Sequence, residues 1–261
     1  MVEDLNRKEI YRNKYYEYWH SRVQESNEVD YRSSKIIKTD FVVPSDSIYR
    51  GFFEKHLVNN GRILDIGCGW GRFFNYYKKY NMQIYGIDIS DIMVKKATEL
   101  FSEIALRIDE GEAEDLPFSD NYFDVVCCFG VFDATFQDKV IKEMLRVCKL
   151  GGSIIFTGKN IRYSLKDEIA YKAELGALNN KEPNYFTNLE ILISELIENK
   201  HVIINKYYFI NRGDMSLNNY VNEPPKEFYE YCLTVKKCSL SYKFSKFYNS
   251  KSENFNIKNS I

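Results

Sequence analysis

The sequence predicts an α/β protein with a doubly wound sheet of seven strands. The sheet is mostly parallel, ends in an antiparallel C-terminal hairpin and is preceded by N-terminal helices. Three observations carry this prediction. Short apolar runs alternate with helical patterns from Gly61 onward, the rhythm of parallel strands joined by crossover helices. The runs are nearly continuous in apolar residues, which is typical of strands buried on both faces. A glycine-rich turn follows the first run, where a doubly wound sheet places its ligand.

The chain begins with a segment that precedes the sheet. Aromatic residues at spacings of three and four predict one or two helices over residues 5–28, within an N-terminal helical unit over residues 1–43. Pro44 begins a further helix, which ends before Gly61.

The strands and helices of the main domain follow from their apolar runs and periodicity. The expected strands are Arg62–Ile66, Gln83–Asp88, Ile104–Ile108, Phe123–Phe129 and Ser153–Thr157. The expected helices are Arg72–Tyr80, Asp91–Phe101 and Gln137–Cys148.

A polar insertion and a hairpin complete this domain, which we place over residues 44–237. Residues 159–186 show no clear period apart from a helical pattern over Lys166–Leu178, and we expect them to form a cap. Residues 187–190 read Thr-Asn-Leu-Glu, a capping box that predicts a helix from Leu189 to Asn199. The strand-like runs that follow are Val202–Ile210 and Phe228–Val235, which can pair as an antiparallel hairpin.

The C-terminal residues 238–261 are rich in Lys, Ser and Asn. From Lys236 onward the chain holds six Lys and one Glu. We expect a basic, flexible arm, although apolar side chains such as Phe247 and Tyr248 can dock part of it on the domain.

Composition excludes several classes of protein. The 261 residues carry a formal net charge of -1, which gives no general affinity for nucleic acid. There is no run of 18 apolar residues and the charged N-terminus lacks a signal-peptide core, so neither a membrane span nor export is expected. The six Cys and three His are scattered without a C-x-x-C pair, so we expect no metal site, and the reduced thiols favour the cytoplasm.

The most informative segment runs from Ile63 to Arg72, where an apolar strand leads into Gly67, Gly69 and Gly71. Glycines let the backbone turn tightly and approach a ligand, and the helix that follows offers unpaired N–H groups. The dinucleotide fingerprint G-x-G-x-x-G does not fit, because the third glycine falls one position early and Arg72 takes its place.

Gly67-x-Gly69-x-Gly71 instead resembles motif I of the class I S-adenosylmethionine-dependent methyltransferases, which have a Rossmann-like fold. Four further segments resemble family motifs in the same order: residues 83–88, 111–118, 120–126 and 145–152. Within them, Glu112 stands where Asp is commoner and Leu150 where Pro is commoner. The resemblance covers about residues 60–158 and implies S-adenosyl-L-methionine as cofactor, with S-adenosyl-L-homocysteine as product.

The resemblance also implies cofactor-binding residues. Asp88 is expected to accept the ribose hydroxyls, with helix capping as the alternative role for this acid. Glu112 is expected at the adenine edge, with a solvated loop acid as its alternative. The remaining expected residues are Ile89 and Ala113 at the adenine, and Asp65, Gly67, Cys68, Gly69, Phe129 and Gly130 toward the methionine.

Catalytic groups are less clearly marked. Family members direct the loop after the fourth strand toward the methyl group, so Asp133 is the candidate base or acceptor-orienting residue, against the alternative of a surface or capping acid. His20 can reach the site from the N-terminal helix, although a lone His beside aromatic residues is more often structural.

The expected function is methyl transfer to a small-molecule acceptor. The loop after the fourth strand resembles the small-molecule group and lacks the Asn/Asp-Pro-Pro-Tyr/Phe motif of enzymes that methylate exocyclic base amines. Aromatic residues in the N-terminal helices, together with the cap, are expected to line the acceptor site or to anchor those helices. Two alternatives stay open: an RNA or protein methyltransferase that uses the basic arm, and a non-catalytic module that keeps the fold.

Overall fold

The computed structural model describes residue 10 and residues 29–30, 35–36, 51–52, 54–215 and 217–258. Most of the expected N-terminal helical unit, including His20, therefore lies outside the described residues. Within that unit two short strands, β1 (Val29–Asp30) and β2 (Lys35–Ile36), pair antiparallel.

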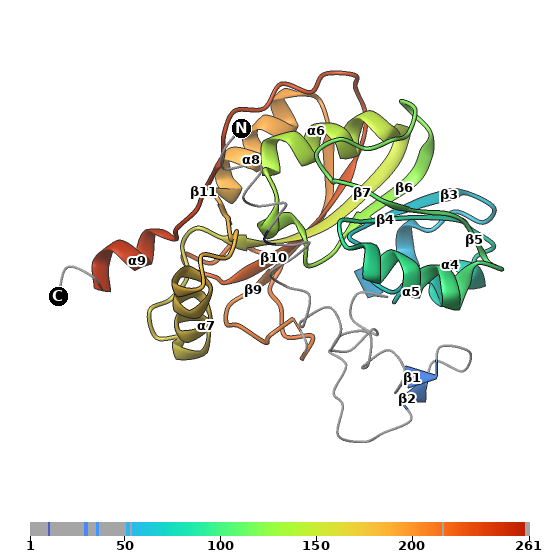
Figure 1. Cartoon of the computed structure of the whole chain (residues 1–261). Helices are drawn as coiled ribbons and strands as arrows, with labels where there is room; N and C mark the ends of the chain where they lie inside the picture. The colour runs from blue at the N-terminus through green and yellow to red at the C-terminus, as the bar shows by residue number, and fades with distance from the viewer. Residues whose placement is uncertain are drawn as a thin grey trace.

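The main sheet confirms the predicted architecture. Its long strands lie in the order β9, β10, β7, β6, β3, β4, β5 (Figure 1). The pairs from β7 through β5 are parallel, whereas β10 is antiparallel to both β7 and β9, so the expected hairpin closes one edge. These strands are β3 (Arg62–Ile66), β4 (Gln83–Asp88), β5 (Ala105–Glu110), β6 (Phe123–Cys128), β7 (Cys148–Asn160), β9 (Val202–Phe209) and β10 (Glu230–Lys236). The predicted count of seven strands is too low, because two further strands of two residues, β8 (Phe186–Thr187) and β11 (Tyr248–Asn249), extend the sheet from the end of β7 and bring it to nine; strands this short have no periodic pattern in the sequence.

Helices cover both faces of the sheet (Figure 1). The helices are α4 (Phe74–Lys79), α5 (Asp91–Phe101), α6 (Gln137–Val147), α7 (Glu168–Asn179), α8 (Leu189–Glu198) and α9 (Glu253–Lys258), with short 3-10 turns η2 (Glu54–His56) and η3 (Phe132–Ala134). Successive strand residues enter different cores. Leu64 packs on the side of α6 and α8, whereas Ile63 packs on the side of α4 and α5. Burial on both faces explains why the strands are continuous apolar runs.

The helix starts show which polar residues act as caps. The Ser90 Oγ accepts a hydrogen bond from the Met93 N–H at the start of α5, so Ser90 and not Asp88 is its N-cap. The expected capping box at residues 187–190 is shifted by one residue, since the Asn188 side chain caps α8. The Thr187 hydroxyl is instead buried, where it lies 2.8 Å from Gln137 Oε1 and 2.7 Å from the Tyr231 hydroxyl.

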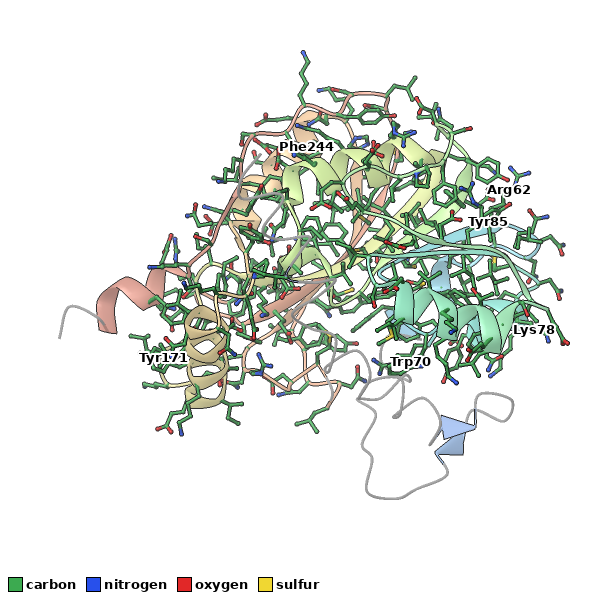
Figure 2. The ribbon with its side chains drawn as sticks, in the orientation of Figure 1. Arg62, Trp70, Lys78, Tyr85, Tyr171 and Phe244 are labelled. Atoms are coloured by element: carbon green, nitrogen blue, oxygen red, sulfur yellow. The ribbon has the colours of Figure 1, made fainter. Side chains whose placement is uncertain are left out.

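Aromatic side chains gather at both ends of the sheet. Tyr85 packs edge-on against Tyr122 and Phe118 at one end of the sheet, where Figure 2 shows it near Arg62. Tyr171, on α7, lies at the other end, where its ring centroid is 5.7 Å from that of Phe255 (Figure 2). The sheet therefore accounts for only part of the 16% aromatic content.

The segment after β10 returns to the domain. Strand β11 pairs with β8, and Phe247 and Tyr248 are buried. The Tyr248 hydroxyl donates to Asp138 of α6, and Arg162 forms an ion pair with Glu253 of α9. These contacts fasten the chain around residues 247–255 to α6, β8 and the segment that carries α7.

Among the described residues no helix is long and apolar enough to cross a membrane.

Candidate functional site

The turn between β3 and α4 is built on glycine backbone geometry. Gly67, Gly69 and Gly71 have φ of +70°, +53° and +83°, a region that residues with a Cβ rarely adopt. At Gly67 a Cβ would also lie 2.2 Å from Cγ2 of Val131, so that side chain covers the turn. At Gly69 a Cβ would meet no atom within 4 Å, which leaves open space above the loop.

Asp88 ends strand β4 beside this turn. Its two carboxylate oxygens accept hydrogen bonds from the Gly69 and Ser90 backbone N–H groups, both at 2.9 Å. Burial raises the pKa of Asp88, while these backbone N–H groups oppose the shift. The carboxylate is thus fixed in orientation. Each oxygen keeps a second lone pair to accept a further hydrogen bond.

Asp65, on strand β3, is more deeply buried than Asp88. The side chain is buried and its carboxylate accepts a hydrogen bond of 3.2 Å from the Tyr77 hydroxyl. Burial raises the pKa of Asp65 to about 7, and the nearby Asp88 carboxylate adds to the effect. Cys68 is also buried, and desolvation raises the pKa of its thiol well above the usual value.

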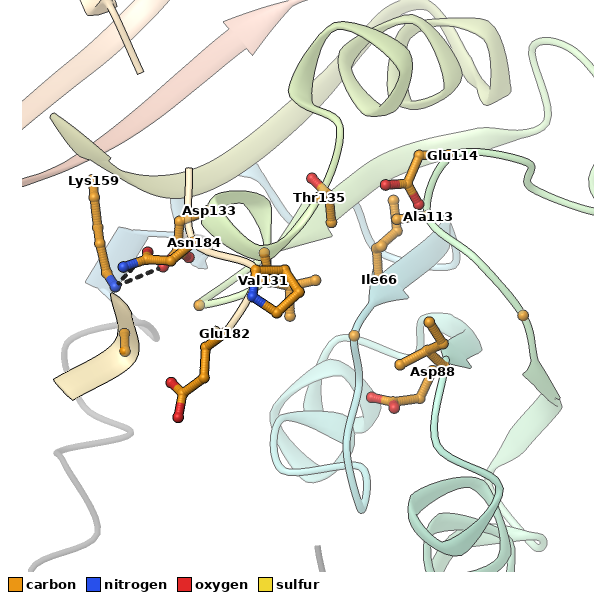
Figure 3. Close-up of a pocket in the computed structure, with 17 residues that line it drawn as sticks. Ile66, Asp88, Ala113, Glu114, Val131, Asp133, Thr135, Lys159, Glu182 and Asn184 are labelled. Atoms are coloured by element: carbon orange, nitrogen blue, oxygen red, sulfur yellow. Dashed lines mark hydrogen bonds and ion pairs between the residues drawn. The ribbon is translucent and has the colours of Figure 1, made fainter. Parts of the chain in front are cut away.

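A cavity of about 420 Å³ opens at the carboxyl ends of the parallel strands (Figure 3). At one end lie Gly67, Asp88, Ile89, Gly111 and Ala113, which come from the loops after β3, β4 and β5. At the other end lie residues of η3 and of the chain on either side of it, and five residues of the segment over 159–186, of which Lys159 is on β7. Those residues are Gly130, Val131, Asp133, Ala134, Thr135, Lys159, Ala177, Glu182, Pro183 and Asn184.

The cavity brings together some of the residues that the sequence singles out. Gly67, Asp88, Ile89, Ala113, Gly130 and Asp133 all line it. Others are placed around the cavity and are not part of its lining: Asp65, Cys68, Gly69, Glu112 and Phe129.

Sequence reasoning missed Glu114, Val131 and Lys159 in the lining. The Glu114 carboxylate accepts a hydrogen bond of 2.8 Å from the Phe136 N–H, which joins the loop after β5 to the start of α6. Lys159 was missed because the apolar run predicts a strand that ends at Thr157, whereas β7 continues to Asn160. Only that continuation places the Lys159 side chain at the cavity.

Lys159 sits among carboxylates. Its Nζ lies 3.1 Å from Asp133 Oδ2 and 3.0 Å from Asn184 Oδ1 (Figure 3). It also lies 3.1 Å from Glu174 Oε1. Burial alone would lower the pKa of Lys159, but the Asp133 and Glu174 carboxylates raise it above the ordinary value. Glu174 is buried and also accepts hydrogen bonds from the Tyr229 hydroxyl and the Asn184 amide.

Within the described ranges, no group of three or more His, Cys, Asp or Glu side chains is arranged to hold a metal ion.

Comparison with known proteins adds to this geometry. Residues 64–156 match the methyltransferase domain family. The chain is 33% identical over 106 residues to the ubiquinone/menaquinone biosynthesis C-methyltransferase of Neisseria gonorrhoeae, which covers 38% of this chain and 43% of that protein. The chain spans half the length or less of these curated relatives.

Solved structures show the same fold over more of the chain. The 4+2 cyclase SpnF has a TM-score of 0.56 at 20% identity, covering 74% of this chain and 82% of that one. Geranyl diphosphate C-methyltransferase from Streptomyces coelicolor, in complex with Mg²⁺, geranyl diphosphate and S-adenosyl-L-homocysteine, has a TM-score of 0.55 at 14% identity, covering 74% and 79%.

The strand order, the glycine turn and the matched domain are together those of the class I S-adenosylmethionine-dependent methyltransferases. Residues 64–156 of this chain are a methyltransferase domain of that class.

Proposed function

We propose that this protein transfers the methyl group of S-adenosyl-L-methionine to a small molecule bound in the cavity. The observation that carries the proposal is the continuity of the cavity. It runs from the glycine turn and Asp88 to Asp133 and the residues around Asn184. A donor held at the first end would face an acceptor held at the second.

The residues at the first end fit the cofactor. Gly69 has open space above it, which the methionine part of the cofactor would fill against the loop backbone. Asp88 would accept the two ribose hydroxyls with the lone pairs that its backbone bonds leave. Ile89, Ala113 and Glu112 would contact the adenine, whereas Asp65, Cys68 and Phe129 would support the methionine side.

The cofactor supplies a methyl group already activated on a sulfonium. The chain's own residues therefore have three tasks: to hold the acceptor in line with the S–CH₃ bond, to exclude water, and to take a proton where the acceptor carries one. Alignment of this kind can supply about 7–11 kcal/mol of the barrier. Residues 177–184 cover the acceptor end and support the proposal that residues 159–186 act as a cap.

Calorimetric titration with S-adenosyl-L-homocysteine tests the donor site. The wild type should bind it, and Asp88→Ala should weaken binding by about 30-fold or more, because two charge-assisted hydrogen bonds are lost. Asp91→Ala is the matched control, since Asp91 is an exposed acid on the first turn of α5. Failure of the wild type to bind, or equal affinity of the Asp88 variant with an unchanged melting temperature, would remove the proposal.

Transfer itself needs a second test, because the same fold is present in the 4+2 cyclase SpnF. Incubation of the protein with a metabolite extract and cofactor labelled in the methyl group should give a labelled small molecule. If the protein binds S-adenosyl-L-homocysteine but labels no small molecule in extracts from several growth conditions, a function of the fold other than methyl transfer is favoured.

A further inference from the structure

The acceptor end of the cavity carries an unusual balance of charge. Among the described residues that line the whole cavity, the charged side chains are those of Asp88, Glu114, Asp133, Glu182 and Lys159. Four carboxylates against one ammonium leave a formal charge of -3. At the acceptor end the relevant groups are Asp133, Glu182 and Lys159.

The single lysine of this lining is committed to the protein. An ammonium group has three N–H donors, and Lys159 has three acceptors within reach: Asp133, Glu174 and Asn184. Two of these acceptors are carboxylates. The positive charge of Lys159 is therefore offset inside the protein, and a phosphate or carboxylate on an acceptor would have to displace one of them.

Asp133 can accept further hydrogen bonds, whereas the three N–H donors of Lys159 are already used. Its ion pair with Lys159 uses one lone pair of Oδ2, whereas a carboxylate can accept about four hydrogen bonds. The ion pair and the bond from the Tyr185 N–H to the Asp133 carbonyl, 2.7 Å long, fix this residue from two sides. A fixed carboxylate in a lining that also holds a second acid, Glu182, suits a positively charged hydrogen-bond donor.

We propose that the acceptor is a small amine, which enters as an ammonium ion and is bound by the Asp133 carboxylate. This inference rests on the proposed function and specifies its acceptor class. It makes Asp133 both the recognition group for the acceptor and the group to which the ammonium hands a proton.

The chemical step balances. The bound ammonium gives one N–H proton to Asp133, which frees the nitrogen lone pair to form a bond with the methyl carbon. The S–CH₃ bond breaks as the N–C bond forms, and its electron pair stays on sulfur. Asp133 then releases its proton to water, so the products are the N-methylammonium ion, S-adenosyl-L-homocysteine and one proton.

Equilibrium binding of three probes of equal size tests the inference without any turnover. The probes are butylamine, butanol and butyrate, measured by saturation-transfer NMR on the full chain at pH 7.5 with saturating S-adenosyl-L-homocysteine. Butylamine should bind at least about tenfold tighter than butyrate and butanol, the effect expected of one charge-assisted hydrogen bond. Asp133→Asn, which keeps an acceptor for Lys159, should abolish the preference, whereas Asp91→Asn should preserve it.

Each result decides one question. Equal or tighter binding of butyrate or butanol to the wild type overturns the amine proposal, and so does an unchanged preference in Asp133→Asn. The wild-type comparison stands alone if that variant fails to fold. The calorimetric titration with S-adenosyl-L-homocysteine reports separately on the donor site, so loss of the amine preference with intact product binding leaves the proposed function in place.

Discussion

Asp65 is a buried carboxyl group whose pKa is raised to about 7, chiefly by desolvation. In the unfolded chain the same group has a pKa of about 4. Between about pH 4 and 7 the native state keeps a proton that the unfolded state has lost, so this residue makes the free energy of unfolding fall as pH rises. Below about pH 4 the group is protonated in both states and has no effect.

We therefore expect Asp65→Asn to gain stability relative to the wild type as pH rises, on the order of 3 kcal/mol by pH 8. Asparagine can still accept the hydrogen bond from Tyr77. Urea unfolding at pH 5, 6, 7 and 8 measures the difference, with Asp91→Asn as an exposed control. Parallel stability curves for wild type and Asp65→Asn would contradict the raised pKa.

Gly67 is constrained twice, by its φ of +70° and by the Val131 side chain above it. Gly67→Ala should destabilise the fold by about 2–5 kcal/mol, from left-handed backbone strain and overpacking. Val131→Ala in the same chain should recover part of that loss, because the nearest atom to the new Cβ is Val131 Cγ2. Gly51→Ala is the control, as nothing lies within 4 Å there. Thermal melts of the four proteins check this, and no rescue by Val131→Ala would refute the contact.

At this scale the sequence predicts the residues at the glycine-turn end of the cavity better than those at the Asp133 end. Gly67 and Asp88 stand in a local pattern of strand, turn and helix, so their place at the cavity follows from neighbours in the chain. Lys159 is held at the cavity by contacts with Asp133 and Asn184, which lie 25 residues or more from it in the chain. No local period records such contacts.

Among the elements, α8 offers a clean test because its cap differs by one residue from the predicted one. Asn188→Ala should cost about 1 kcal/mol by removing the acceptor for the Ile191 N–H. Thr187→Val should act through a different route, since it leaves a buried Tyr231 hydroxyl without that partner. Helix-specific hydrogen exchange separates them: fraying at the start of α8 is expected for Asn188→Ala alone. Fraying in Thr187→Val and none in Asn188→Ala would restore the original capping box.

Element boundaries were predicted well where burial is two-sided. The strands β3 and β4 and the helix α5 have the predicted limits, because each is bounded by turn residues and the two strands are buried in the cores on both faces of the sheet. Strand β7 is longer than predicted. Its outer half pairs antiparallel with β10, from Ser153↔Lys236 to Lys159↔Glu230, and that pairing keeps polar residues extended.

For the whole molecule, the C-terminal segment should control the stability of the cap. Phe255 is buried and packs on Tyr171 of α7. Phe255→Ala should speed amide exchange across α7 and leave β3 and β4 unchanged, because local opening draws on few buried contacts. Hydrogen exchange with mass spectrometry measures both regions, with Leu240→Ala as an exposed control. Equal protection of α7 in wild type and Phe255→Ala would contradict this role.

The order of the long strands can be predicted from the sequence, whereas the pairing of β8 with β11 at the edge of the sheet cannot. Alternating strands and helices dictate a parallel core, and the runs near residues 202–236 indicate the hairpin. Strands β8 and β11 have two residues each and lie about 60 positions apart, so neither has a periodic pattern and their pairing depends on the assembled core.

The pairing of β8 with β11 also has a consequence for biosynthesis. A chain emerging from the ribosome completes the glycine turn and the parallel strands long before it supplies Tyr248 and Phe255. Folding from the N-terminal side would then form the donor half first, and the acceptor half would mature only when the last described residues arrive. Under the proposed function, the order of translation would thus let a newly made chain hold its donor before it can choose an acceptor.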